Sequence, residues 1–276
     1  MARSNPCSDL SGTWRNELGS NLTITHVPNS SFITGWYSTA VESSPNAASI
    51  SSNITGIVHN FTKAENRSLV AFNVIWRNGS SLTSWVGECI SCNGEEKIYT
   101  TWVLRTLKNR KDKWMSTLIN EDTFWRVDRT SHTTPVSEDT ITNSSIVGKW
   151  QSETGDCISI TNVIKPKDLK GSHKSPTETN GSPIFGQFDG NGTYFAVALV
   201  NVDGDRITGW SGHIYNPLEK KPVMETSWLS YKFSNLCNNP RANVNYGMYN
   251  YTYITGIINR KENVSELKVI YDYKFG

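Results

Sequence analysis

A single carboxylate, Asp122, is the residue of this chain whose setting most clearly requires a binding partner. It lies in residues 112–127, DKWMSTLINEDTFWRV, where side chains roughly alternate from Ser116 onward. Alternation at period two predicts a strand, with one face made of Leu118, Asn120, Asp122 and Phe124. A carboxylate that faces an apolar interior needs a hydrogen-bond donor opposite it. A ligand could supply that donor, so ligand binding is the first chemistry to consider.

Catalytic patterns are missing from the sequence. The five histidines share no spacing with cysteines or carboxylates, and we interpret each as a surface or strand residue: His26, His59, His132, His173 and His213. No nucleophile elbow is present. The C-x-x-C of residues 89–92 precedes an Asn-Gly turn, with no helix start or second ligand pair, which argues against a redox or zinc site. We therefore expect no enzyme activity, no metal site and no cofactor.

The elements that must position Asp122 are strands. Thr, Val, Ile, Tyr and Trp are abundant, with 10 Trp and 11 Tyr, and Asn, Gly and Ser punctuate them. No long stretch has apolar residues at a 3.6-residue period, so the chain is predicted to be all-β. A net charge of +2 gives no argument for nucleic acid. No apolar run approaches the roughly 20 residues of a membrane-spanning helix.

An internal repeat divides the chain. The G-x-W of residues 12–14 recurs at 148–150, each followed by a glycine and an apolar strand. A repeat that recurs after the length of a whole domain predicts two similar domains, 1–127 and 146–276. Residues 128–145 are polar and aperiodic, and we interpret them as a linker.

Several features favour a secreted glycoprotein. The chain has many N-x-S/T triplets, at Asn21, Asn29, Asn53, Asn60, Asn66, Asn78, Asn143, Asn180, Asn191, Asn250 and Asn263. Five cysteines suit an oxidising compartment, with one left over. The first residues lack the apolar segment of a signal peptide, which would fit a mature form to which Met1 was added.

The first half resembles the avidin and streptavidin family of biotin-binding proteins. Residues 14–21, WRNELGSN, are similar to the family's first strand and turn, and 32–41, FITGWYSTAV, to its T-G-x-Y-x-[ST]-A-V segment. Residues 81–87, SLTSWVG, resemble its Ser, Thr and Trp strand, and 112–127 resemble its last strand. The resemblance implies two tandem eight-stranded antiparallel up-and-down β-barrels, the second more divergent.

The resemblance also implies a biotin site in the first barrel. In the family, the positions of Asn16, Ser20 and Tyr37 bind the ureido oxygen. The positions of Thr39 and Asp122 accept from the two ureido N–H groups. The whole implied set is Asn16, Leu18, Ser20, Tyr37, Thr39, Val41, Trp76, Ser81, Thr83, Trp85, Trp102, Trp114 and Asp122.

Two further features are implied by the same resemblance. Cys7 and Cys89 match the family's disulfide, whereas Cys92 has no counterpart. Trp114 would cap the pocket of a neighbouring subunit, so we expect a homo-oligomer in which two chains form a pseudo-tetramer of barrels.

The second half retains the scaffold and departs from the ligand set. Ser152, Thr154 and Asp156 take the places of Asn16, Leu18 and Ser20. The remaining expected matches are Phe188 with Tyr37, Gly190 with Thr39, Trp210 with the Trp76 strand, Trp228 with Trp85, Tyr253 with Trp102, Val264 with Trp114, and Tyr271 or Asp272 with Asp122. Asp156 would place negative charge where the biotin carbonyl oxygen lies. Cys157 and Cys237 could pair within this domain.

We expect the first barrel to bind and sequester biotin, and the second to be a scaffold or to bind a different ligand. One alternative is a lipocalin-like carrier, which predicts a C-terminal helix and no polar floor such as Asp122. The other is a secreted structural, defence or egg glycoprotein that uses its barrels as rigid interaction modules without biotin binding.

Overall fold

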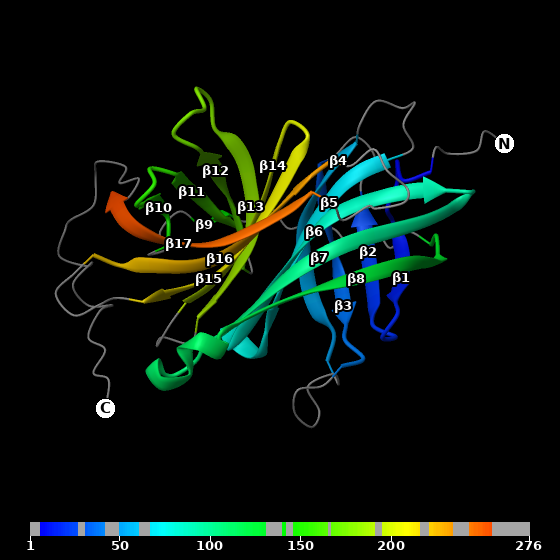
Figure 1. Ribbon diagram of the computed structural model, residues 1–276, viewed down its shortest axis with the longest axis horizontal. Coiled ribbons are helices and arrows are strands. Elements are labelled where there is room, and N and C mark those ends of the chain that lie inside the picture. Colours follow the sequence, from blue (N-terminus) through cyan, green and yellow to red (C-terminus); the bar gives the residue numbers. More distant parts are fainter. Residues whose placement is uncertain are drawn as a thin grey trace.

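The computed structural model describes residues 6–26, 31–41, 50–60, 67–130, 140–141, 146–164, 167–190, 195–215, 221–233 and 243–255 (Figure 1). These residues form two closed barrels side by side, which confirms the expected all-β fold of two eight-stranded antiparallel barrels.

In the first barrel each strand pairs with the next, and the last pairs with the first. Its strands are β1 (Gly12–Asn16), β2 (Asn21–His26), β3 (Phe32–Ser38), β4 (Ser52–Asn60), β5 (Arg67–Trp76), β6 (Ser81–Cys92), β7 (Glu95–Thr106) and β8 (Thr117–Asp128). Two short 3-10 turns connect the later strands, η1 (Arg77–Gly79) and η2 (Arg110–Met115).

The second barrel repeats this order and closes through the pairing of β10 with both β11 and β17. Its strands are β10 (Gly148–Ser152), β11 (Cys157–Ile164), β12 (Asp168–Lys174), β13 (Ser182–Gly190), β14 (Phe195–Asp203), β15 (Arg206–Tyr215), β16 (Val223–Lys232) and β17 (Val244–Thr255). A two-residue strand, β9 (Thr140–Ile141), lies within the range predicted as a linker and pairs with β11.

The repeated G-x-W closes one end of each barrel. Trp14 and Trp150 are almost fully buried, and their indole N–H groups donate to Leu10 O at 2.9 Å and Ile146 O at 3.1 Å. Gly12 has a φ of +116°, and a Cβ there would lie 2.0 Å from the Asp128 carbonyl oxygen. Only glycine fits this close approach, which explains the first residue of the motif.

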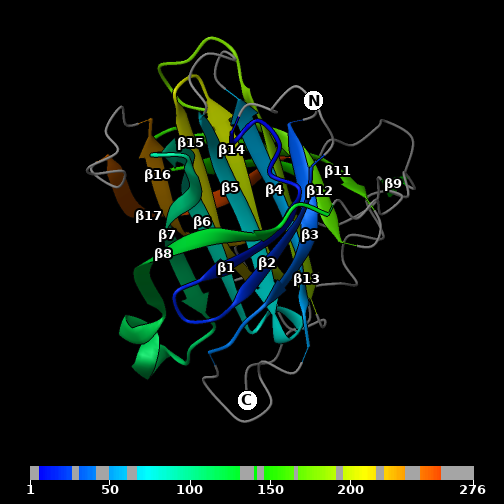
Figure 2. The ribbon, with the colours of Figure 1, turned by 90° about the vertical axis from the view of Figure 1, so that its right-hand side faces the viewer.

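The two barrels pack against each other through their middle strands, β4 to β7 against β13 to β16 (Figures 1 and 2). Apolar residues that point out of both barrels form one shared cluster: Ile57, Leu69, Ala71, Val86, Val103, Val200, Ile207, Leu229 and Tyr231. Ser84 Oγ donates to Trp210 O across this interface at 2.9 Å. The second barrel is therefore a packing partner of the first.

Cysteine pairing in the first barrel agrees with the pattern that the family resemblance implies. Cys7 and Cys89 form a disulfide with a Cα–Cα distance of 5.6 Å. Cys92 is also disulfide-bonded, whereas Cys157 is a free thiol. The pairing of Cys157 with Cys237, which the sequence left open, is therefore excluded.

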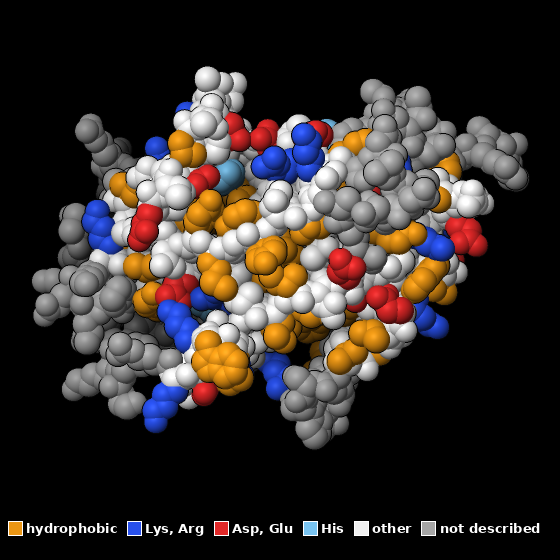
Figure 3. Space-filling view, in the orientation of Figure 1, with side chains coloured by type: hydrophobic (Ala, Val, Ile, Leu, Met, Phe, Trp, Pro, Cys, Tyr) orange, Lys and Arg blue, Asp and Glu red, His pale blue; other side chains and the backbone are white. Residues whose placement is uncertain are grey.

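The outer surface carries mixed charge. On the face shown in Figure 3, Lys and Arg side chains alternate with Asp and Glu, and apolar side chains are scattered between them. Among the described residues, no helix has the length and apolar character needed to cross a membrane.

Candidate functional site

Four polar residues meet inside the first barrel, and we call them the polar floor: Asn16, Ser20, Tyr37 and Asp122. Each is at most 4% exposed. Asn16 ends β1, Ser20 follows it in the turn to β2, Tyr37 lies on β3, and Asp122 lies on β8. The barrel closes between β8 and β1, which places Asp122 beside Asn16 although 106 residues separate them.

Asp122 is held by donors from three side chains, Trp85, Asn16 and Trp102. The Trp85 indole N–H donates to its Oδ2 at 2.8 Å, and Asn16 Nδ2 donates to its Oδ1 at 3.3 Å. Burial raises the pKa of Asp122 to about 6, while the hydrogen bond from Trp85 acts in the opposite direction. The group is therefore a carboxylate above pH 6, aimed into the barrel as an acceptor.

The other floor residues are fixed by the turn that follows β1. Asn16 Oδ1 accepts the backbone N–H of Ser20 at 2.8 Å, which fixes the amide so that its NH2 group points toward Asp122. Ser20 Oγ accepts the backbone N–H of Ala40 at 3.0 Å. Burial, followed by the nearby Asp122 charge, raises the pKa of Tyr37 far above its usual value, so its hydroxyl remains a donor.

Aromatic rings line the wall above the floor. Trp85 stacks on Phe72 with ring centroids 4.8 Å apart, and Tyr37 lies 5.1 Å from Trp85. Trp76 donates its indole N–H to Thr83 Oγ1 at 2.8 Å, and Trp102 packs against the same interior cluster. Together they make an apolar wall over a polar base, which suits a flat ligand with a polar head.

Other predicted site residues lie toward the rim of the barrel. Leu18 is 60% exposed in the turn after β1, and Val41 is 53% exposed after β3. Thr39 Oγ1 is engaged in a local turn, since it accepts the Val41 N–H at 3.1 Å and donates to Val41 O at 3.0 Å. Ser81 begins β6 and is half-buried. In this structure these four do not join the polar floor.

Trp114 lies apart from the other members of the set. It belongs to η2, between β7 and β8, and is 80% exposed. Figure 1 shows this green coil projecting from the edge of the first barrel. Its ring is therefore free to reach another molecule, whereas the pocket of its own barrel is lined without it.

Two interior aromatic residues were missing from the predicted set. Phe72 stacks on Trp85, and Phe124 lies 6.4 Å from Tyr37, measured between ring centroids. Alternation along each strand carried the signal, because Phe72 shares a strand face with Trp76 and Phe124 shares one with Asp122.

Strand register corrects the expected matches in the second barrel. In the first barrel Trp14 pairs with Leu22, which pairs with Tyr37; in the second, Trp150 pairs with Ile158, which pairs with His173. His173 therefore takes the place of Tyr37. Phe188 and Gly190 lie one strand later, on β13, and are wrong matches.

A glycine could have revealed the His173 match. Gly35 lies two residues before Tyr37, and a Cβ there would meet Thr23 O at 1.9 Å. Gly171 lies two residues before His173, and a Cβ there would meet Ser159 O at 2.0 Å. The shared close approach makes the G-x-aromatic spacing a stronger marker than the surrounding residue types.

The remaining matches shift in the same way. Trp85 pairs with Trp102 across β6 and β7, as Trp210 pairs with Trp228 across β15 and β16. Trp210 and Trp228 therefore take the places of Trp85 and Trp102. The expected matches of Trp210 with the Trp76 strand, of Trp228 with Trp85 and of Tyr253 with Trp102 are wrong. Asn16 pairs with Phe124, as Ser152 pairs with Tyr251, so Tyr249 takes the place of Asp122. Val264, Tyr271 and Asp272 lie outside the described residues.

The described residues contain no group of three or more His, Cys, Asp or Glu side chains placed to hold a metal ion. The chemistry that the first barrel offers is hydrogen bonding at its floor and apolar contact at its wall.

Comparison with known proteins identifies the family. The family described as "Avidin family" matches residues 4–127 and 140–254. Avidin from Gallus gallus is 36% identical over 123 residues, which cover 44% of this chain and 79% of that protein. Fibropellin-1 from Strongylocentrotus purpuratus is 31% identical over 122 residues, which cover 44% of this chain and 11% of that protein.

Among solved structures, Xenavidin is 34% identical and covers 43% of this chain and 98% of its own, with a TM-score of 0.39. The structure titled "biotin binding protein from chicken" is 33% identical and covers 44% of this chain and 98% of its own, with a TM-score of 0.39. The family matches both halves, and this chain belongs to the avidin family as a tandem of two barrels.

Proposed function

We propose that the first barrel binds biotin non-covalently and with high affinity, and thereby sequesters it. One observation carries this proposal: the buried Asp122 carboxylate is held by Trp85 and Asn16 beside Ser20 and Tyr37. A cyclic urea needs this combination, because its carbonyl oxygen accepts from Asn16, Ser20 and Tyr37 while an N–H group donates to Asp122.

The remaining members of the proposed site act around that head group. Trp76, Trp85 and Trp102 bury the apolar body of the ligand, with Thr83 between them. Leu18, Thr39, Val41 and Ser81, which lie at the rim, would contact the ligand only after it has entered. A second ureido N–H is then available to Thr39 if its local turn with Val41 opens.

We also propose that the protein acts as a secreted homo-oligomer. Trp114 is 80% exposed on η2 within one chain, so a second chain would receive it. Two chains, each with an internally packed pair of barrels, would then form a pseudo-tetramer.

The test is a biotin titration of the full chain, followed by tryptophan fluorescence and by calorimetry. One site per chain is the expected result, because Trp85 borders the Asp122 floor of the first barrel and the second barrel lacks that carboxylate. Binding of no biotin would contradict the proposal and favour barrels that act as rigid interaction modules. Two sites per chain would show that the second pocket tolerates Asp156.

A further inference from the structure

The floor of the second barrel has hydrogen-bonding polarity opposite to that of the first. The register matches Ser152, Asp156, His173 and Tyr249 to the four floor residues Asn16, Ser20, Tyr37 and Asp122. Asp156 thus places an acceptor where the first barrel has the Ser20 hydroxyl. Tyr249 places a phenol where the first barrel has its carboxylate.

Asp156 is built into its position. Its Oδ2 accepts from Thr154 Oγ1 at 2.6 Å and from Ser152 Oγ at 3.3 Å, and its backbone N–H donates to Ser152 Oγ at 3.0 Å. Its other oxygen lies 3.6 Å from His173 Nε2, and the carboxylate is 15% exposed. The oxygen that faces His173 is thus ordered and still reachable.

The surroundings of His173 are acidic. Asp156, Glu178 and Asp203 all act on its ring. Burial nevertheless holds the pKa of His173 below its usual value, so the imidazole is neutral near pH 7 and does not itself offset this negative field. A positively charged group is the natural complement to it.

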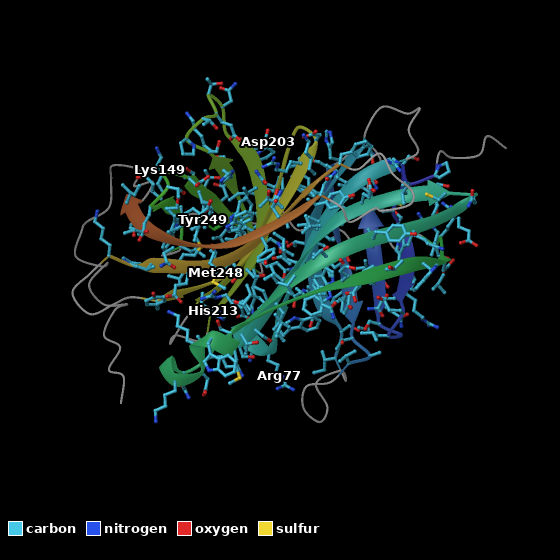
Figure 4. The ribbon with its side chains drawn as sticks, in the orientation of Figure 1. Arg77, Lys149, Asp203, His213, Met248 and Tyr249 are labelled. Carbon is cyan, nitrogen blue, oxygen red and sulfur yellow. A yellow bond between two sulfur atoms is a disulfide. The ribbon has the colours of Figure 1, made fainter. Side chains whose placement is uncertain are left out.

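Two buried donors face this interior without an acceptor. Trp228 Nε1 has no hydrogen-bond partner among the described residues, and the fully buried Tyr251 hydroxyl accepts from the Trp210 side chain but has no acceptor there for its own proton. In the first barrel Asp122 is the acceptor at this side of the floor. Its replacement by Tyr249, which Figure 4 labels on β17, removes that carboxylate. Unpaired buried donors are costly, so a ligand that brings an acceptor would satisfy them.

Aromatic rings surround these polar groups. Trp210 lies 5.0 Å from His173, and Trp228 stacks on Tyr249 at 5.6 Å, measured between ring centroids. Trp210 belongs to the core of the second barrel, and Trp228 and Tyr249 pack against that core. Aromatic faces attract cations as well as flat apolar groups.

We infer that the second barrel binds a small organic cation with a flat apolar body, its ammonium group at Asp156 and a hydrogen-bond acceptor at Trp228 and Tyr251. This ligand has the opposite polarity to a ureido ring, which presents a carbonyl oxygen to the floor. The site is independent of biotin binding by the first barrel.

The probes for calorimetry are three molecules of similar shape. Tyramine carries both the ammonium and an acceptor oxygen, 2-phenylethylamine carries the ammonium alone, and tyrosol carries the oxygen without the charge. Each is titrated into the full chain with and without saturating biotin. We expect tyramine to bind at one site per chain under both conditions, and tyrosol at least tenfold more weakly.

Two variants locate the site. Asp156→Asn should weaken tyramine at least tenfold because it removes the charge, whereas Asp205→Asn, at an exposed ion pair with Lys232, should not. Trp228→Phe keeps a ring but removes the N–H, so it should weaken tyramine several-fold and leave 2-phenylethylamine unchanged. Circular dichroism and biotin stoichiometry show whether each variant remains folded.

Three results would overturn the inference: no heat from tyramine at millimolar concentrations, equal affinity for tyramine and tyrosol, or equal losses in Asp156→Asn and Asp205→Asn. A second biotin site per chain, lost in Trp228→Phe, would also overturn it, because the second floor would then accept a ureido ring.

Discussion

Glu225 of the second barrel accepts a hydrogen bond at 2.5 Å from the ammonium group of Lys113, the residue that precedes Trp114. The same carboxylate accepts from Arg105 of β7 at 2.9 Å and from the Tyr215 hydroxyl at 2.6 Å. Burial alone would raise the pKa of Glu225, but the Lys113 and Tyr215 hydrogen bonds hold it below its usual value. The second barrel thus anchors the turn that presents Trp114.

We predict that Glu225→Gln increases the rate of biotin release several-fold, because the turn that carries Trp114 loses its anchor. Displacement of labelled biotin measures this rate. In a Trp114→Ala background the Glu225 change should add nothing, since both act through the same ring. Glu95→Gln, at an exposed ion pair on β7, serves as the control. Additive effects would show that Glu225 acts by another route.

Trp114→Ala should speed biotin release about 10- to 100-fold with little loss of stability. The ring is 80% exposed within one chain, so its burial occurs only against a partner, where a large side chain is worth roughly 1.5–3 kcal/mol. Off-rates and thermal unfolding measure the two effects. Trp125→Ala, at another exposed tryptophan on β8, should leave the off-rate unchanged. Equal off-rates in Trp114→Ala and wild type would rule out capping.

Asp122→Ala should weaken biotin roughly 10- to 150-fold, the range expected for loss of about 1.5–3 kcal/mol from a hydrogen bond to a charged group. In the wild type, affinity should also decline below pH 6, because protonation of Asp122 removes a carboxylate acceptor. Calorimetry between pH 4 and 8 tests both statements. Asp122→Asn keeps an acceptor oxygen, so its affinity should not vary with pH over this range. If the wild-type affinity varied with pH as little as that of Asp122→Asn, a residue other than Asp122 would be the acceptor.

Glu88 should make folding stability fall as pH rises, whereas biotin affinity is expected to fall as pH decreases. Glu88 is fully buried on β6, and burial raises its pKa to about 7, although a hydrogen bond from Tyr231 and the charge of Arg67 act in the opposite direction. The folded state therefore binds the proton more tightly than the unfolded state, so stability falls as pH rises from about 4.5 through 7.

Glu88→Gln should flatten this dependence and raise the free energy of unfolding at pH 8 by about 1–3 kcal/mol. Urea unfolding at pH 5 and pH 8 is the measurement. The exposed Glu95→Gln should keep the wild-type slope. Parallel curves for Glu88→Gln and wild type would show that Glu88 is solvated in the folded chain.

Much of the first barrel was predictable because its segments resemble those of a known family in order and spacing. Alternation placed Asp122 on a strand face with apolar neighbours, and the resemblance supplied the barrel and the other site residues. The site of the second barrel was harder to predict, because few residue types of the first barrel are kept there. Each residue match therefore depends on which strands of the two barrels are taken as equivalent. The equivalence of His173 in the second barrel to Tyr37 in the first follows from the register of strand pairing. Only the folded chain defines that register.

The packing of one barrel on the other was not predicted, although β5 carried a signal. Its residues Leu69 and Ala71 point outward to the second barrel, while Val70 and Phe72 point inward. A continuous apolar run is typical of a strand buried on both faces, whereas an exposed barrel wall would alternate.

The shared apolar cluster between the barrels has a consequence for how the chain could diverge. Because both partners belong to one polypeptide, their association does not weaken on dilution, and each first barrel always meets a second barrel in a one-to-one ratio. A mutation in one interior is never copied into the other, unlike in an assembly of identical subunits. Tethering therefore allows one interior to change its chemistry while the outward face that supports its neighbour is preserved.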